Sequence, residues 1–270
     1  MNLIMKQPIN ESLLKNLHIL TRDGKLNQDS NRKLKQIFHL YQFIEPLLKN
    51  IALQTEFHCA DLGAGKSYLG FIIYDLFFST HAHGHFYAIE SRAELVEKCR
   101  EIKTSCHFDR LNFIQSYISD EKSSSLTPEK IDLVMALHAC DTATDDAIDF
   151  ALKKKSSHIV LIPCCQAEVA SVLNKNKNAS FSKTHLSEIW RHPLHTREFG
   201  STLTNALRSL RLQAAGYNVS VTEFVGLEHS LKNELIIAKY TGEKRKNAPE
   251  RIESILAELN LSELQNRFLV

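Results

Sequence analysis

The chain has 270 residues, which suits one large α/β domain or one domain with a small extension. Hydrophobic residues make up 43% and charged residues 24%, as in an ordinary soluble globular protein, and the formal net charge of +2 does not by itself indicate nucleic-acid binding. The apolar run at 69–78 is too short to span a bilayer, so we expect a cytoplasmic protein with no membrane segment.

The cysteines support the same location. None of them forms a CxxC pair, and several lie in apolar runs that are typical of strands, so we interpret them as reduced thiols. They are Cys59, Cys99, Cys106, Cys140, Cys164 and Cys165.

The first 50 residues are expected to be a helical extension. Leu34, Phe38, Tyr41 and Ile44 recur at helical spacing. Gly24 and the polar residues after it interrupt the pattern, so two helices are expected rather than one.

A central α/β domain is expected over residues 51–242. Apolar runs predict strands at 57–62, 86–89, 111–115, 131–137 and 158–162, and the segments between them predict helices at 67–78, 92–103 and 141–153. Strands that alternate with helices predict a parallel sheet with right-handed crossovers.

The end of the chain departs from this alternation. Residues 167–200 form a polar insertion that we expect to lie over the carboxyl ends of the strands. A helix at 203–214 then ends before Gly216, and strands at 219–225 and 235–240 are close enough to pair antiparallel at the sheet edge. Residues 243–270 are expected to carry an amphipathic helix at 249–264.

A glycine turn follows the first strand of the α/β region. Asp61 precedes Gly63 and Gly65, and the glycines let the backbone turn sharply and approach a ligand. Tyr68 stands where a dinucleotide motif would have its third glycine, and a carboxylate at Asp61 would repel a pyrophosphate. The same carboxylate can attract the cationic amino group of a methionine moiety, and Glu90, at the end of the second strand, can accept hydrogen bonds from two ribose hydroxyls.

These motifs resemble motif I and the acidic position after the second strand in class I S-adenosylmethionine-dependent methyltransferases. The resemblance covers roughly residues 30–240. It implies a Rossmann-like, mostly parallel sheet of seven strands in the order 3-2-1-4-5-7-6 with the last strand antiparallel. It also implies S-adenosylmethionine as cofactor, with the following binding residues: Asp61, Leu62, Gly63, Ala64, Gly65, Glu90, Ser91, Ser116, Tyr117, Leu137 and His138.

A second set of motifs resembles a narrower group, which includes tRNA 2′-O-methyltransferases and methyltransferase-like proteins of unassigned substrate. These motifs are residues 136–145 after the fourth strand, 163–166 after the fifth, and 232–234 before the last. The chain departs from the group at Asp141, where glycine is usual, and at Gln166, near the expected histidine. It also carries no Cys/His zinc module near residue 1.

Adjacent parallel strands bring the residues after the fourth and fifth strands to one rim, where ligands bind in open α/β sheets. His138 is the expected general base, and Asp141 is expected to orient it or to accept a proton itself. Asp141 or Thr142 would equally serve as a helix cap, and Cys164 and Cys165 as packing residues. A zinc site built from His138, Cys140, Cys164 and Cys165 has poor ligand spacing, so no metal is expected.

The methyl acceptor is left open by these motifs. Trp190, Arg191 and Arg197 in the insertion suggest an RNA acceptor, because cations contact phosphates and an indole ring stacks on bases. The other cations of residues 171–211 are Lys175, Lys177, Lys183, Arg208 and Arg211. The alternatives are a small-molecule or protein acceptor, or a non-catalytic binding module; a nicotinamide oxidoreductase is disfavoured by Tyr68. No NPPY-type motif follows the fourth strand, which argues against methylation of an exocyclic amine.

Overall fold

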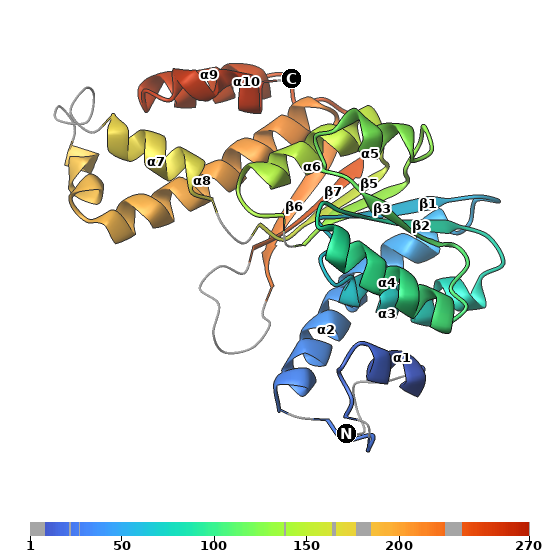
Figure 1. Ribbon diagram of the computed structural model, residues 1–270. Helices are drawn as coiled ribbons and strands as arrows, with labels where there is room; N and C mark the ends of the chain where they lie inside the picture. Colours follow the sequence, from blue (N-terminus) through green and yellow to red (C-terminus); the bar gives the residue numbers. More distant parts are fainter. Residues whose placement is uncertain are drawn as a thin grey trace.

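The computed structural model describes residues 9–21, 23–26, 28–137, 139–163, 166–176, 185–224 and 234–269. Their centre is a seven-stranded sheet in the order β3-β2-β1-β4-β5-β7-β6, as the sequence predicts (Figure 1). The strands are β1 (His58–Leu62), β2 (His85–Glu90), β3 (Leu111–Gln115), β4 (Leu133–Ala136), β5 (His158–Leu161), β6 (Tyr217–Glu223) and β7 (Glu234–Tyr240). Only β7 runs antiparallel to its neighbours, β5 and β6.

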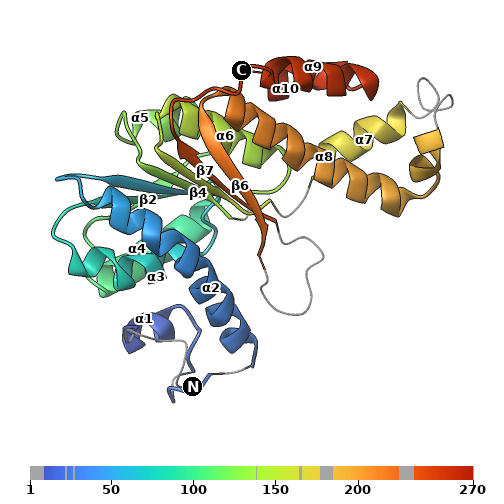
Figure 2. The same ribbon diagram turned by 180° about the vertical axis from the view of Figure 1, so that it is seen from behind.

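Helices cover both faces of this sheet. One core lies between the sheet and helices α2, α3 and α4, and a second between the sheet, α6 and the end of α8 (Figures 1 and 2). Every residue of β4 and β5 is buried, as expected for strands covered on both faces. The covering helices are α2 (Gln28–Ile51), α3 (Tyr68–Leu76), α4 (Ala93–Ser105), α5 (Glu121–Ser125), α6 (Thr142–Lys153) and α8 (Pro193–Ala214).

The first 50 residues contain two helices, as the interrupted periodicity predicts. Asn10 caps the short helix α1 (Glu11–Asn16) by accepting bonds from the main-chain N–H groups of Ser12 and Leu13. Helix α2 packs against α3, so it joins the core of the sheet. The division of the chain at residues 50 and 242 stays a prediction.

The insertion differs from its predicted placement. Helix α8 begins at Pro193 rather than at residue 203, because proline is favoured in the first turn of a helix. Helix α7 (Glu168–Lys175) and the first half of α8 project away from the sheet instead of covering its carboxyl ends (Figures 1 and 2).

The C-terminal helices pack on this projection. Helices α9 (Ala248–Glu258) and α10 (Gln265–Phe268) share a third core with α7 and α8. The predicted single helix at 249–264 is thus broken after residue 258. Within the residues that the structure describes, no helix is both long and apolar enough to cross a membrane.

Candidate active site

A pocket of about 300 Å³ opens at the carboxyl ends of β1 to β4. The predicted residues Gly63, Glu90, Ser91, Ser116 and Tyr117 line it. Further lining residues could not be predicted from the motifs: Ile89, Arg92, Ile118, Ser119, Ala139, Ala143 and Asp146. Most of them lie within a few positions of a strand end. Their closeness to a predicted strand end is the sequence signal that could have identified them.

The turn after β1 has the backbone geometry that glycine permits. Gly63 and Gly65 have φ angles of 70° and 58°, in the left-handed region that favours glycine. The N–H groups of Gly63 and Ala64 donate to the carbonyl of Ile89 at 2.9 and 3.0 Å, and these bonds hold the turn against the end of β2. The backbone can therefore approach a ligand in the pocket closely.

Glu90 is a nearly buried carboxylate in the pocket wall. Its oxygens accept the main-chain N–H groups of Gly65 at 2.8 Å and Arg92 at 3.0 Å, and two bonds from the Arg92 guanidinium. Burial alone would raise the pKa of Glu90, but these bonds outweigh it and hold the pKa below its usual value. Glu90 is therefore a charged acceptor, and the exposed Arg92 side chain fills the lone pairs that ribose hydroxyls would use.

Asp61 lies deeper than expected. The residue is 4% exposed, and the lining of this pocket includes Gly63 but not Asp61. Burial, and then the neighbouring charge of Glu90, raise the pKa of Asp61 to about 7. A cation beside Asp61 would reverse this shift, which is the electrostatic role that the sequence assigns to it. Leu62 and Leu137 are also buried outside this lining, and Ala64 and Gly65 form the turn beneath it.

The end of β3 supplies the opposite wall. Ser116 is buried in the lining, and its hydroxyl oxygen has no hydrogen-bond partner among the described residues. Tyr117 beside it is exposed. A buried, unpartnered hydroxyl next to a free aromatic ring fits the polar edge and the flat face of an adenine ring.

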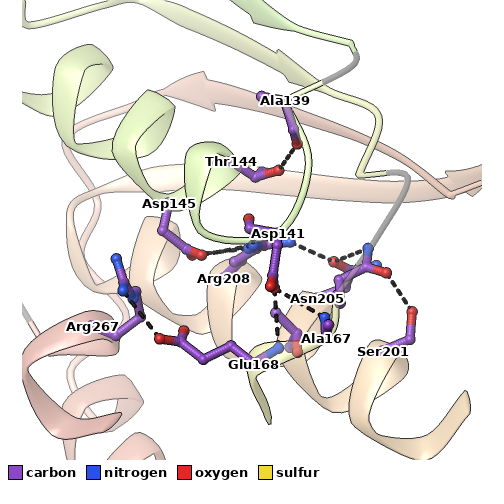
Figure 3. Close-up of polar contacts among 12 residues, drawn as sticks. Ala139, Asp141, Thr144, Asp145, Ala167, Glu168, Ser201, Asn205, Arg208 and Arg267 are labelled. Carbon is purple, nitrogen blue, oxygen red and sulfur yellow. Dashed lines mark hydrogen bonds and ion pairs between the residues drawn. The ribbon is translucent and has the colours of Figure 1, made fainter. Parts of the chain in front are cut away.

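Asp141 follows β4 with a backbone conformation that is normally reserved for glycine, at φ 50° and ψ −122°. Its carboxylate accepts the N–H groups of Ala167 and Glu168 at 3.0 and 3.2 Å (Figure 3). Asp141 thus tethers the loop after β4 to the start of α7, and its side chain makes no capping bond to its own helix, α6. His138 lies outside the described residues, and both catalytic assignments stay predictions.

A carboxyl-end polar cluster lies beside Asp141 (Figure 3). Arg208 is fully buried and binds Asp145 through two bonds of 2.9 and 2.7 Å, and it donates to the carbonyl of Asp141 at 2.7 Å. Asn205 accepts from Arg208 and Gln166 at 3.3 Å, and donates to Glu234 at 2.6 Å. The cluster joins the loops after β4 and β5 to α8 and to the start of β7.

The structure corrects the predicted basic insertion. Trp190 is 4% exposed and packs edge-on against Phe199, so it offers no stacking surface. Each described cation of the insertion and α8 is ion-paired: Lys175 with Glu263, Arg191 with Glu188, Arg197 with Glu198, Arg208 with Asp145 and Arg211 with Asp149. Lys177 and Lys183 lie outside the described residues.

Four cysteines lie in the described part of the chain. Cys59, Cys99 and Cys106 are free thiols, and Cys140 lines the pocket. Among the described residues, no group of three or more histidines, cysteines or carboxylates could hold a metal ion. Cys164, Cys165, Lys232 and Asn233 lie outside the described part of the chain.

Comparison with known families identifies the family of this chain. Residues 32–172, more than half of the chain, match the model of a family described as "Methyltransferase domain". The chain belongs to this methyltransferase family. It is therefore an S-adenosylmethionine-dependent methyltransferase with the Rossmann-like sheet of class I enzymes. A search of curated proteins finds no match.

Solved methyltransferase structures resemble the chain at low identity. The precorrin-6y C5,15-methyltransferase of Geobacter metallireducens GS-15 is 17% identical over 73% of this chain and 87% of its own, with a TM-score of 0.44. The methyltransferase PaMTH1 of Podospora anserina is 13% identical over 87% of this chain and 90% of its own, with a TM-score of 0.48. An rRNA methylase of Streptococcus thermophilus is 9% identical over 72% and 92%, with a TM-score of 0.44.

Proposed function

We propose that this methyltransferase binds S-adenosylmethionine in the pocket between Gly63, Glu90 and Ser116 and methylates an RNA acceptor. One observation carries the cofactor placement: a left-handed glycine turn and a buried, charged Glu90 open onto the same pocket. Glu90 is placed to accept the ribose hydroxyls, and the turn from Gly63 to Gly65 to contact the methionine part. Asp61 neutralises the amino group from below, and Ser116 and Tyr117 hold the adenine.

Methyl transfer requires little from the protein beyond correct positioning of the two reactants. Bound S-adenosylmethionine supplies an electrophilic methyl group on its sulfonium sulfur. Transfer to a hydroxyl requires in-line placement of the acceptor and, at most, a base that takes the proton from the acceptor oxygen. We assign that base to His138, and we assign to Asp141 the placement of the loop that carries it. The two bonds from the start of α7 to the Asp141 carboxylate support this division of roles.

The RNA acceptor is supported by the motifs after β4 and β5, which resemble those of the group that includes tRNA 2′-O-methyltransferases. A small-molecule acceptor is the second candidate. It is favoured by the ion pairs of the insertion, because charges that are neutralised within the fold contribute little to the binding of phosphates.

A methyl-transfer screen tests the acceptor. Tritium-methyl S-adenosylmethionine would be incubated with wild type and Glu90→Gln, and with total RNA, protein extract or a small-molecule extract. We expect tritium in the RNA fraction. This incorporation should disappear after ribonuclease treatment and should be lower with Glu90→Gln than with wild type. Glu101→Gln, an exposed glutamate on α4, is the matched control and should keep full activity. Counts confined to the small-molecule fraction would replace RNA by the second candidate.

A further inference from the structure

Exposed cations gather at the amino end of β5, opposite the cofactor pocket. They come from the end of α6, the turn before β5, the end of β7 and the loop from β7 to α9. We call them the amino-end basic surface: Lys153, Lys155, Lys239, Lys244, Arg245 and Lys246. None of these cations forms an ion pair with a carboxylate in the described ranges, and Arg245 bonds instead to the neutral side chains of Gln213 and Asn247.

The register of β5 and β7 places Lys239 close to Lys155. Lys239 pairs with His158 of β5, and the N–H of Tyr240 donates to the carbonyl of Ser157 at 2.8 Å. Lys155 therefore lies next to the end of β7. The lowered pKa of His158, caused by burial and then by the charge of Lys239, agrees with this placement.

The two covering helices extend the surface. The pairs Arg208–Asp145 and Arg211–Asp149 show that α6 and α8 run side by side in the same direction. Lys153, at the end of α6, is thus brought beside the end of α8. The main-chain N–H of Arg245 and its guanidinium both donate to Gln213 there, which fixes the β7–α9 loop at the same place. Figure 2 shows β7 leading towards α9 next to the end of α8.

The amino-end basic surface differs from the insertion in how its cations are paired with carboxylates. The described cations of the insertion all face carboxylates, whereas the amino-end basic surface leaves its charges for a partner. Glu243 is the carboxylate within the same loop. The chain carries a net charge of only +2, so this concentration of unpaired cations marks one end of the molecule.

An exposed aromatic ring ends β7, directly before the loop that carries Lys244, Arg245 and Lys246. Tyr240 is 52% exposed, and its ring is held edge-on against Tyr217 at a centroid distance of 5.2 Å. A ring that is both supported and exposed can stack on an unpaired base, and neighbouring cations can contact the phosphates on either side of it. Trp190, which the sequence suggests for this role, is buried.

We propose that the amino-end basic surface binds the sugar-phosphate backbone of an RNA, with a base stacked on Tyr240. This inference rests on the proposed RNA acceptor and names the surface that holds it. Strand β7, Glu234–Tyr240, separates the two ends of the sheet by about 20 Å at ~3.3 Å per residue. An RNA that reaches from this surface to the pocket must therefore be a polynucleotide rather than a single nucleotide.

Fluorescence anisotropy with a labelled single-stranded RNA of about 20 nucleotides tests the inference over a salt series from about 50 to 200 mM. The variant Lys239→Gln/Arg245→Gln/Lys246→Gln is expected to bind about tenfold more weakly at low salt, and each lost phosphate contact should lower the slope of log affinity against log salt by about 0.7. Tyr240→Leu should weaken binding with the salt slope unchanged, because stacking releases no counterions.

The matched control removes as many cations from the insertion, with Lys175→Gln/Arg191→Gln/Arg197→Gln, and is expected to bind RNA like wild type. Calorimetry with S-adenosylhomocysteine should give the wild-type affinity for both triple variants, which shows that they are folded. Equal RNA affinity of the amino-end variant and wild type would overturn the inference, as would a polyglutamate chain that binds this surface as tightly as RNA. If RNA binds there but only small molecules are methylated, the acceptor proposal fails while the surface stands.

Discussion

Asp61, which we propose to face the amino group of the cofactor, lowers the stability of the fold at neutral pH. Its pKa rises from 3.8 in the unfolded chain to about 7 in the fold, chiefly through burial. Unfolding releases this carboxyl to ionise, so the contribution of Asp61 to stability is most favourable below pH 4, falls as pH rises towards 7 and levels off above it. Asp61→Asn is therefore expected to stabilise the protein without cofactor at pH 8, by at most roughly 4 kcal/mol, and not at pH 4.

Thermal unfolding of wild type and Asp61→Asn between pH 4 and 8 measures this. The control is Asp109→Asn, an exposed aspartate that should show no such pH dependence. Calorimetry should show that Asp61→Asn binds S-adenosylhomocysteine more weakly, by ~1–3 kcal/mol for one lost charged partner. A variant with unchanged affinity would remove Asp61 from the cofactor site.

Arg92 occupies the acceptor positions of Glu90 that we propose for a ribose. Its exposed guanidinium makes bonds of 2.9 and 3.3 Å to the two Glu90 oxygens. Arg92→Ala frees those positions, so we expect tighter binding of S-adenosylhomocysteine by a few fold, an effect that should shrink with salt. Weaker binding in Arg92→Ala would instead make Arg92 a direct contact of the cofactor.

The backbone conformation at Asp141 is one that glycine adopts without strain. Residues with a side chain are strained at φ 50° and ψ −122°, by about 1–3 kcal/mol. We expect Asp141→Gly to be more stable than Asp141→Ala, the reverse of the usual order, because only glycine relieves the strain after the bonds to α7 are lost. Denaturant unfolding measures the order. A positioning role also predicts more activity in the glycine variant, whereas a catalytic carboxylate predicts equal losses in both.

At the scale of elements, the sequence predicted what depends on near neighbours. The strands, the glycine turn and the helices that flank it follow from periodicity and turn residues, which act over a few positions. The role of Arg208 could not be predicted, because its partner, Asp145, lies 63 positions away. The start of α8 was misplaced although its signal, Pro193, is local. In sequence, Arg208 looks like any other cation on a helix, and only the packing of α6 beside α8 buries it.

The buried pair Arg208–Asp145 provides a prediction for these elements. Arg208→Met leaves the Asp145 carboxylate buried without its cation, so we expect a loss of about 3–5 kcal/mol of unfolding free energy. The double variant Arg208→Met/Asp145→Leu should lose less than the single one, because no uncompensated charge remains. Urea unfolding measures both, with Arg191→Met in the exposed pair with Glu188 as control, at under about 1 kcal/mol. A double variant as unstable as the sum of its singles would contradict the coupling.

Across the whole molecule, the pocket was easier to predict than the surface. Glu90 and the glycine turn stand at strand ends, and topology alone brings strand ends together. The ability of a surface to bind phosphates depends on which of its cations already form ion pairs with carboxylates in the folded protein. The insertion was interpreted as basic although its described cations are paired, and Lys239 and Arg245 were overlooked although they are not. Trp190 was misassigned because composition does not show burial.

Calorimetric titration of wild type and Glu90→Gln with S-adenosylhomocysteine, S-adenosylmethionine and NADH tests the cofactor site. We expect micromolar binding of both sulfur compounds to wild type and no heat from NADH. Glu90→Gln should weaken the binding of both sulfur compounds by ~1–3 kcal/mol, because a carboxylate that accepts ribose hydroxyls is lost. Tight binding of NADH together with no response to either sulfur compound would show that the pocket is not an S-adenosylmethionine site.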